Sequence, residues 1–347
     1  MLRFLTAGES HGEALLSILE GMPSGIKINV DSINKDLKRR QDGPGRGQRM
    51  YIESDKAKIL SGIMKGATIG SPIAIAIENK DFSIDKLPSV KNPRPGHADM
   101  AGVLKYGFDD ARCVLERASA RETAARVSIG AICKILLAEF DINVSSRVIA
   151  IGGAESEKLM EEKINEAEKS KDTLGGIFEV TVKGTPVGLG SYAHYDRRLD
   201  AKIAEAIMSI PAVKAVEIGN AIDCADKPGS KVHDEIFYSK EKGIYRKTNN
   251  AGGLEGGMSN GEDIIVQGYM KPISTLMNAL NTIDIDTQKQ AKASTERSDV
   301  CAVHAAGVVG EAMMAFVIAR ALLEKFGGDS VLEIKRNYKG YIAGLKF

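Results

Sequence analysis

The sequence predicts an α+β fold organised as a single interwoven domain, residues 1–347. Segments with the two-residue alternation of strands and segments with helical periodicity both occur along the whole chain. No low-complexity linker divides the chain, and no signature recurs with a period of about 20–50 residues, which argues against a repeat protein. Unusual glycine-bearing loops are dispersed from residue 8 to residue 299, so if they share one site the chain must fold as one unit.

The N-terminal part is expected to begin with two short strands, 2–6 and 14–20, around the turn GESHG. A helix is expected over 31–40, with Asp31 and Ser32 as candidate N-caps. The glycine-rich loop QDGPGRGQR follows. The alternating, β-branched segment SPIAIAIEN then predicts another strand.

Residues 109–140 carry the longest helical signal, and the apolar second half of this segment predicts a buried helix. An αβ stretch is expected over 176–219, as a strand, a helix from Leu199 and a second strand. The segment DIIVQGYM predicts a strand. A final helix is expected from near Asp299 to about Phe326.

Composition excludes several classes of protein. Hydrophobic residues make up 43% and charged residues 27%, which is typical of a folded globular chain rather than a disordered one. With 47 Lys and Arg against 46 Asp and Glu, the chain lacks the strong positive charge of many nucleic-acid-binding or polybasic membrane proteins. Glycine is abundant, at 36 of 347 residues, which suggests many tight turns and places where backbone approaches a ligand.

A cytoplasmic location is expected from three features. The N-terminus lacks the pattern of a signal peptide. The most hydrophobic segment, 305–323, contains Glu311 and Arg320, so a core helix is expected rather than a transmembrane span. The four cysteines form no CxxC pair and no zinc-ligand spacing, and we interpret them as reduced, mostly buried thiols.

The first candidate site is a basic, glycine-rich stretch. It contains Lys38, Arg39, Arg40, Arg46 and Arg49, and Arg40 and Arg46 flank the sequence DGPG. Arginine forks suit phosphate or carboxylate groups, and glycine lets backbone approach a ligand. A solvated basic loop, or an RNA contact through a Gly/Arg segment, remains an alternative.

Two histidines, His11 in GESHG and His97 in RPGHAD, lie in glycine-bearing loops. Histidine exchanges protons near neutral pH, so both are candidate acid–base residues, although a surface role is the simpler interpretation of each. GESHG shares the spacing of the serine hydrolase motif GxSxG. The long apolar strand and following helix of a nucleophile elbow are missing, which argues against that class.

The segment RASARETAAR places Arg117 and Arg121 four residues apart, on one face of the expected helix. Together with Ser119 they could bind an anion. An ion pair of Arg121 with Glu116 or Glu122 on an exposed face fits the spacing equally well.

Two further segments, NNAGGLEGGMSNG and KPIST, could form anion-binding turns or simple surface loops. Ser298 and Asp299 precede an apolar helix and are most simply its N-cap. The dinucleotide-binding pattern GxGxxG and the P-loop pattern are both missing. Residue chemistry alone therefore indicates an enzyme for a small, multiply anionic substrate and gives no reaction type.

Six of these segments, in this order along the chain, resemble the chorismate synthase family: TAGESHG at 6–12, GRG with Arg at 45–49, RPGHAD at 94–99, RASARETAAR at 117–126, NNAGGLEGGMSNG at 249–261 and KPIST at 271–275. The resemblance extends from residue 3 to about residue 320. It implies a β-α-β sandwich, with two antiparallel-rich sheets enclosing central helices, and a homotetramer.

The resemblance also implies a reaction. It is the 1,4-anti elimination of phosphate from 5-enolpyruvylshikimate 3-phosphate to give chorismate, in the shikimate pathway to the aromatic amino acids, with reduced FMN and no net redox change. The substrate carries two carboxylates and a phosphate, which would explain arginines in a neutral protein. The substrate-binding arginines it implies are Arg46, Arg49, Arg94 and Arg121.

By the same resemblance, His11 would protonate or hydrogen-bond the leaving phosphate and His97 would serve the flavin. Asp299 would assist loss of the C6 proton, and Ser10 and Ser119 would complete a relay. The FMN contacts it implies are Arg117, Ala118, Ser119, Pro211, Ala212, Gly256, Lys271, Pro272, Ile273, Ser274, Thr275 and Arg297.

Two arginines, Arg40 and Arg46, match positions assigned to NADPH in some members of the family. The sequence leaves open whether the protein reduces its own flavin or receives reduced flavin from a separate reductase. A conventional flavin oxidoreductase is a further alternative, and it would consume one equivalent of reductant in each turnover.

Overall fold

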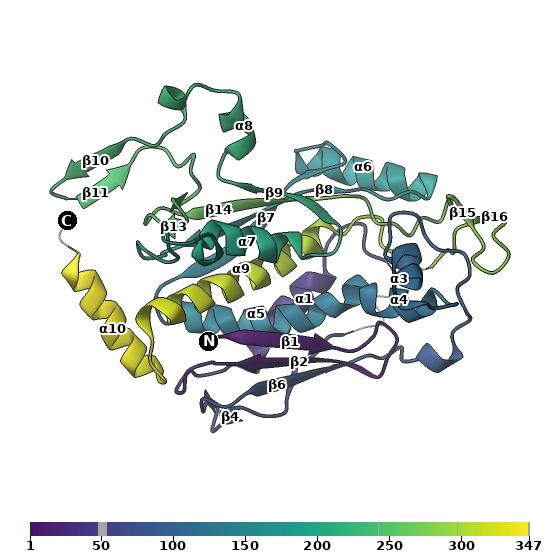
Figure 1. Ribbon diagram of the computed structural model, residues 1–347, viewed down its shortest axis with the longest axis horizontal. Helices are drawn as coiled ribbons and strands as arrows, with labels where there is room; N and C mark the ends of the chain where they lie inside the picture. Colours follow the sequence, from purple (N-terminus) through teal and green to yellow (C-terminus); the bar gives the residue numbers. More distant parts are fainter. Residues whose placement is uncertain (48–53, 242, 297, 346–347) are drawn as a thin grey trace.

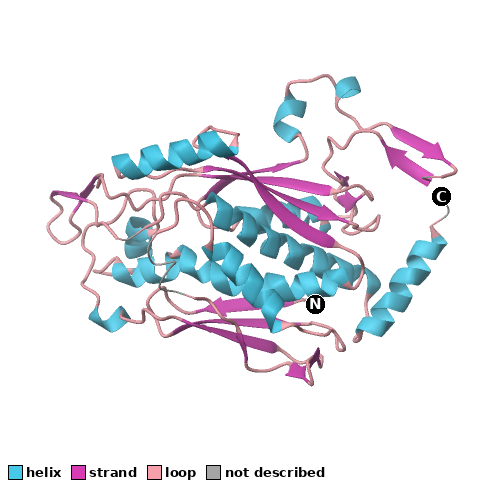
Figure 2. Cartoon of the chain, turned by 180° about the vertical axis from the view of Figure 1, so that it is seen from behind, coloured by secondary structure: helices cyan, strands magenta, loops and turns pink. Residues whose placement is uncertain are grey.

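Two antiparallel sheets lie on either side of a layer of helices in the computed structural model, which describes residues 1–47, 54–241, 243–296 and 298–345 (Figure 1, Figure 2). The mixture of helices with antiparallel sheets confirms the α+β class. One large cluster of buried apolar residues runs from Leu2 to Ile334 and takes in side chains of both sheets and of the helices between them.

The first sheet has the strand order β1-β2-β6-β3, with bounds Arg3–Ala7, Ala14–Glu20, Ile73–Glu78 and Lys58–Ile59. Alternate residues of β2 are buried, including Leu15 and Leu19, as expected for a strand with one face on the core. The strands expected at 2–6, at 14–20 and in SPIAIAIEN are therefore confirmed.

The second sheet has the order β7-β8-β14-β9, with bounds Asn143–Ile151, Gly176–Lys183, Ile264–Met270 and Val213–Ile218. The expected strands in 176–219 and in DIIVQGYM are confirmed, whereas β7 was missed. Short two-stranded ribbons complete the strands: β4 and β5 (Ile63–Met64, Ala67–Thr68), β10 and β11 (Ile236–Ser239, Gly243–Arg246), β12 and β13 (Leu254–Glu255, Met258–Ser259), and β15 and β16 (Asn281–Ile283, Gln290–Lys292).

The middle layer contains α1 (Val30–Gln41), α5 (Thr123–Ala138) and α9 (Val303–Phe326). Helix α5 contacts β2 and β6 of the first sheet, and α9 contacts β7 and β8 of the second. The two helices pack closely because Gly130 faces Ala312: a Cβ added at Gly130 would lie 2.2 Å from the Cβ of Ala312. The separation of the two sheets therefore depends on a position without a side chain.

The other helices within the described residues lie around these layers. Their bounds are Asp99–Tyr106 (α3), Arg112–Ala118 (α4), Glu157–Ser170 (α6), Leu199–Met208 (α7), Ala221–Ala225 (α8) and Val331–Gly344 (α10). Helix α7 packs beside α9 and β9 and confirms the helix expected from Leu199. Single 3₁₀ turns occur at Ile84–Lys86, Ala120–Glu122, Tyr195–Arg197 and Gly229–Lys231.

Several expected boundaries were wrong. The segment 109–140 is not one helix, because Ser119 adopts an extended conformation (φ −64°, ψ 140°) that ends α4 before α5 begins. Helix α1 is capped by Asn29, whose side chain accepts a hydrogen bond from the N–H of Asp31, rather than by Asp31 or Ser32. The helix expected from near Asp299 to about Phe326 is confirmed as α9, although it begins only at Val303, whereas α6 and α10 were missed.

Helix α9 is long and apolar enough to cross a membrane, but 83% of its most hydrophobic window is buried inside the protein. This burial matches the core helix expected for 305–323. Within the described ranges all four cysteines are free: Cys133 and Cys301 are buried, Cys224 is half-buried and Cys113 is exposed.

Candidate active site

Most of the predicted site residues lie in loops at the end of the layers where β1 leads into β2 and where α3 and α4 lie (right side of Figure 1). Hydrogen bonds connect these loops: the N–H of Ser294 donates to the carbonyl of Asn92, and the N–H of Val300 donates to that of Gly45. Segments from across the sequence therefore meet in one region.

His11 is held by a buried carboxylate. Its Nδ1 lies 3.0 and 3.1 Å from the two carboxylate oxygens of Glu116, and its backbone N–H donates to Oε2 at 2.9 Å. Arg112 donates to the same carboxylate at 3.3 Å and also pairs with Glu296 at 3.0 Å. Burial raises the pKa of Glu116, but the hydrogen bonds from His11 and Arg112 outweigh it and hold that pKa below its usual value.

His97 has the same kind of partner, from its own loop. Its Nδ1 lies 2.5 Å from Oδ1 of Asp99, the first residue of α3, and the side chain of Asp99 is fully buried. Arg94 donates to Asp99 through Nε at 2.8 Å and to the hydroxyl of Thr275 at 2.7 Å. Burial raises the pKa of Asp99, but the hydrogen bonds from His97 and Arg94 lower it well below its ordinary value.

Arg46 and Asp299 form an ion pair between the loop after α1 and the loop before α9. Nη1 of Arg46 lies 2.5 Å from Oδ2 of Asp299, and the N–H of Gly47 donates to Oδ1 at 2.6 Å. Asp299 is therefore not an N-cap, and α9 begins at Val303 without a side-chain cap. His304 lies next to this pair; burial, and then the charge of Arg46, lower its pKa.

Arg121 and Arg40 converge on Asp55. Arg121 donates through Nη1 at 2.6 Å, Arg40 donates through Nη2 at 2.8 Å, and Arg121 also donates to Oδ1 of Asn79 at 2.9 Å. Burial raises the pKa of Asp55, but the charges of Arg40 and Arg121 outweigh it and lower that pKa. The alternative of an ion pair of Arg121 with Glu116 or Glu122 on an exposed face is wrong, because Arg121 is buried and pairs with Asp55.

Arg117 and Arg121 do not share a helix face, because the extended backbone at Ser119 separates α4 from the following turn. Arg117 donates instead to the carbonyls of Thr6 and Gly8, both at 2.9 Å. Ser119 donates to the hydroxyl of Ser10 at 3.2 Å, so these two predicted relay residues are in contact.

The KPIST segment follows β14 and adjoins the His97 loop. Lys271 Nζ donates to the carbonyl of Gly96 at 2.8 Å and to Ser274 Oγ at 2.9 Å. Burial, and then the charge of Lys214, lower the pKa of Lys271. The N–H of Lys271 donates to the carbonyl of Ala212, which has a left-handed backbone (φ 68°), so the predicted dipeptide Pro211–Ala212 joins this segment.

One predicted cofactor contact lies elsewhere. Gly256 is in the β12–β13 turn, where Gly257 accepts a hydrogen bond from the N–H of Leu199 at the start of α7. Ala212 follows the other end of α7, and a helix of 10 residues spans about 15 Å. Within one chain the structure does not bring Gly256 to the KPIST segment. The predicted residues Arg49 and Arg297 lie outside the described residues.

Three carboxylates of this site were missed by sequence reasoning: Asp55, Asp99 and Glu116. Asp99 could have been found from the sequence, because it lies two residues after His97 in the motif RPGHAD. Glu116 is 105 residues from His11, and Asp55 is 66 from Arg121, so nothing local in the sequence indicates either contact.

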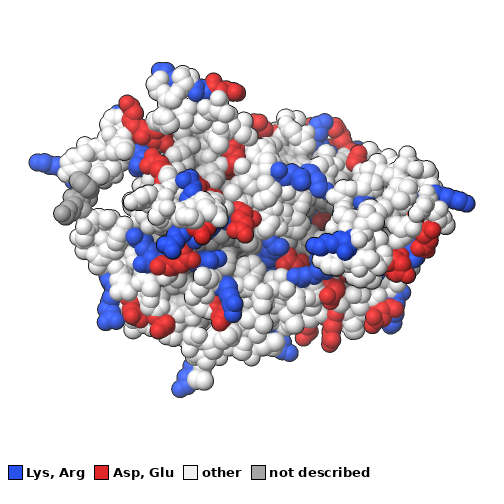
Figure 3. All heavy atoms as spheres, in the orientation of Figure 1, with Lys and Arg blue, Asp and Glu red and all other residues white. Residues whose placement is uncertain are grey.

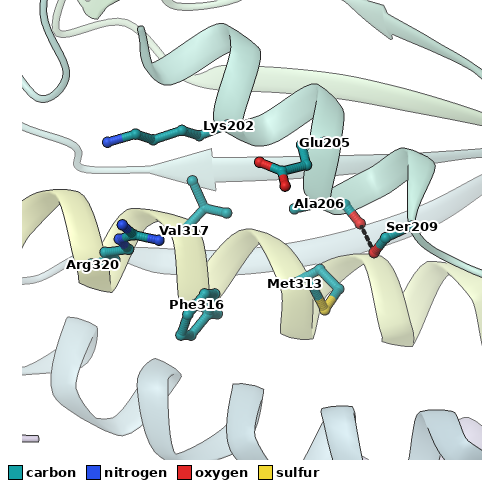
Figure 4. Close-up of a pocket in the computed structure, with 8 residues that line it drawn as sticks. All are labelled: Lys202, Glu205, Ala206, Ser209, Met313, Phe316, Val317 and Arg320. Carbon is teal, nitrogen blue, oxygen red and sulfur yellow. Dashed lines mark hydrogen bonds between the residues drawn. The ribbon is translucent and has the colours of Figure 1, made fainter. Parts of the chain in front are cut away.

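Lys and Arg side chains gather around a hollow near the middle of the face in Figure 3. A separate groove between α7 and α9 is lined by Lys202, Ser209 and Phe316, among others, and contains none of the predicted site residues (Figure 4). Arg40 is only 3% exposed and the side chain of Arg46 7%, so these two arginines of the Gly/Arg segment cannot track a nucleic-acid backbone along the surface, which argues against the RNA-binding alternative.

Known proteins are similar to this chain over its whole length. A family model described as chorismate synthase matches residues 2–323. The chain belongs to the chorismate synthase family. It is 56% identical to a chorismate synthase of Thermoanaerobacter pseudethanolicus and 54% identical to one of Caldanaerobacter subterraneus subsp. tengcongensis, with 99% of each chain covered in both cases.

A solved structure titled "Crystal Structure of Chorismate Synthase" has a TM-score of 0.80 and 42% identity, covering 99% of this chain and 97% of that one. The family named from the six motifs is therefore confirmed. Chorismate synthases are carbon–oxygen lyases acting on phosphates, so the predicted enzyme class is confirmed as well.

Proposed function

We propose that this protein converts 5-enolpyruvylshikimate 3-phosphate to chorismate and phosphate by 1,4-anti elimination, with reduced FMN as cofactor. Membership of the chorismate synthase family carries the proposal. The arrangement of two histidines, each held by a buried carboxylate, beside a group of arginines is consistent with chemistry on a multiply anionic substrate.

The arginines divide into two groups by their contacts. Arg46, in the loop after α1, pairs with Asp299. Arg121, in the turn after α4, pairs with Asp55 and donates to Asn79, whose side chain donates to the carbonyl of Gly12 next to His11. We assign these two, with Arg49, to the phosphate and carboxylates of the substrate, because guanidinium forks bind such anions by charge-assisted hydrogen bonds. Arg94 is assigned to the same anions, and its hydrogen bonds to Asp99 and Thr275 also hold the His97 loop.

Residues around the KPIST segment fit the phosphate of FMN. The ammonium groups of Lys271 and Lys214 repel each other, as the lowered pKa of Lys271 reflects after the effect of burial, and an anion between them would relieve this. Ser274 and Thr275 add hydroxyl donors, and Arg117, Ala118 and Ser119 would hold the cofactor from α4. Reduced FMN, when bound, supplies an electron-rich ring for this redox-neutral elimination and a base for the C6 proton.

The chain's own acid–base groups have separate parts. His11 is assigned to the leaving phosphate, where it donates a hydrogen bond or a proton. Ser119 donates to the hydroxyl of Ser10, the residue before His11, and these two serines are assigned to a proton relay. His97 is assigned to the flavin, next to Lys271 through Gly96. Asp299 is assigned to assisting the loss of the C6 proton, and its ion pair with Arg46 holds the carboxylate in place.

The source of reducing equivalents is part of the proposal. Arg46 and Arg40 match NADPH positions, but both are engaged by carboxylates: Arg40 is buried on Asp55 and Arg46 pairs with Asp299. We therefore favour delivery of reduced FMN by a separate flavin reductase.

Assembly, architecture and location complete the proposal. The layered arrangement supports a β-α-β sandwich, and the continuous core supports a single catalytic domain, residues 1–347. The β10–β11 hairpin projects from the body and exposes Ile236, Tyr238 and Ile244, which supports burial in a homotetramer. Free cysteines support a reducing, cytoplasmic compartment.

An anaerobic assay tests the function directly. The protein is mixed with 5-enolpyruvylshikimate 3-phosphate and dithionite-reduced FMN, and chorismate and phosphate are measured together with the flavin spectrum. We expect one phosphate for each chorismate and no net oxidation of flavin. Oxidation of one flavin for each chorismate would contradict the elimination and favour a flavin oxidoreductase.

A further inference from the structure

The carboxylate of Glu116 is buried beneath His11 and has no part in the function proposed above. The residue is 3% exposed, the backbone N–H of His11 donates to its Oε2, and Nδ1 of His11 lies 3.0 and 3.1 Å from its two oxygens. A buried carboxylate aimed at a proposed acid–base residue calls for an explanation, because burying a charge is unfavourable unless it is paired.

The protonation state of Glu116 determines which nitrogen of His11 carries the proton. An ionised carboxylate only accepts hydrogen bonds, so a neutral imidazole whose Nδ1 faces it must carry its proton on Nδ1. Arg112 supports the ionised state, since it donates to Glu116 at 3.3 Å. The lowered pKa of Glu116 agrees with this geometry.

We propose that Glu116 is a positioning residue: held by Arg112, it fixes His11 in the Nδ1–H tautomer, so that Nε2 is the nitrogen that exchanges a proton at the leaving phosphate. This inference rests on the role proposed for His11. It assigns to α4 the task of orienting a loop residue 105 positions earlier in the chain.

The contacts of Glu116 also fix the orientation of His11, in addition to its tautomer. Because Oε2 binds both the backbone N–H and the ring of His11, the carboxylate fixes the loop and the side chain at once. The N–H of Ser10 donates to the backbone carbonyl of Glu116, which adds a third tie between the loop and α4. Arg112 also reaches Glu296 in the segment that leads to Asp299, so the same arginine links both sides of the site.

The test begins with the protein free of FMN and substrate. ¹⁵N spectra of histidine-labelled protein distinguish the two tautomers of a neutral imidazole, and the chain has five histidines, so His11→Asn identifies the signal of His11 by its loss. We expect Nδ1–H in the wild-type protein. An Nε2–H tautomer for neutral His11 would overturn the proposal even if every variant failed to fold.

Glu116→Gln keeps the size of the side chain and supplies an amide donor towards Nδ1. We expect the tautomer to change to Nε2–H and single-turnover chorismate formation to fall about 10- to 100-fold, with little change in KM for the substrate. Glu116→Asp keeps the charge and should restore the Nδ1–H tautomer and part of the rate. Wild-type tautomer and rate in Glu116→Gln would overturn the proposal.

Glu296→Gln is the matched control, because it removes the other carboxylate on Arg112 without touching His11. It should keep the Nδ1–H tautomer, and a change to Nε2–H in this variant would mean that net charge, not the Glu116 contact, sets the tautomer. The tautomer measurement needs neither flavin nor turnover. If the wild-type protein forms no chorismate, the proposed reaction fails while the role of Glu116 is still decided.

Discussion

The two histidines of the site have partners of the same chemistry but of different origin. His97 binds Asp99, two residues away, and the carboxylate is held by Arg94 from the same loop. His11 binds Glu116 from a helix that begins about a hundred residues later. The first cluster is formed by one continuous segment, whereas the second exists only when the tertiary fold is complete.

The two clusters therefore differ in how far their geometry depends on the tertiary fold. The His97 cluster depends on one loop and on the start of α3, so its geometry is set mostly by local contacts. The His11 cluster depends on the packing of α4 against the β1–β2 loop and on Arg112. We expect a change in tertiary packing to affect His11 first.

The largest expected effect comes from removing the histidines themselves. His11→Ala and His97→Ala should each slow chorismate formation about 10²- to 10⁴-fold, because each removes a positioned acid or base. Only His97→Ala should alter the spectrum of bound reduced flavin. Single-turnover rates and flavin spectra, with folding checked by circular dichroism, test both.

The results for the two histidine variants test each assigned role separately. Full activity in either variant removes the catalytic role of that histidine. If only His11→Ala perturbs the flavin spectrum while both are slow, the two assignments must be exchanged.

Replacing the buried carboxylates should lower the free energy of unfolding. Asp99→Asn leaves Arg94 buried without its carboxylate, and breaking such a pair costs about 3–5 kcal/mol. Glu116→Gln should cost less, about 1–3 kcal/mol, because Arg112 keeps Glu296. Urea unfolding of both variants measures the free energies, and equal losses would show that the two clusters are equally essential to the fold.

A smaller effect is expected on substrate binding. Arg46→Ala and Arg121→Ala should each weaken substrate binding by about 1.5–3 kcal/mol, through the loss of a charge-assisted hydrogen bond, and should change FMN binding much less. Titration calorimetry with each ligand measures both affinities. Unchanged substrate affinity in both variants would show that the arginines near the His11 cluster do not bind the substrate.

The smallest expected effect is on how the stability of the folded protein depends on pH. The pKa values of Asp99 and Glu116 are lowered in the folded protein, so the unfolded state binds more protons in acid. Their stabilisation is present above the unfolded pKa, near 4, and is lost as the pH falls through the folded values. Urea midpoints measured from pH 6 to pH 3 should fall less steeply in Asp99→Asn than in the wild-type protein, and parallel curves would contradict this.

Features set by local sequence could be predicted, whereas contacts between distant segments could not. Periodicity predicted strands such as β14 and the buried α5, because one buried face imposes a repeat on the sequence. The break at Ser119 was missed, since RASARETAAR has good helix formers throughout. The motif loops indicated His11 and His97, but the Glu116 contact arises from packing between distant segments, which no local pattern records.

The close contact of Gly130 with Ala312 has a consequence for how the enzyme can change. His11 is attached to the first sheet and Lys271 to the second, and α5 and α9 separate the two sheets. A methyl group at position 130 would push these helices apart and so increase the distance between the His11 loop and the KPIST segment. Gly130, in the middle of a core helix, therefore helps to set the spacing of the two loops on which the proposed chemistry depends.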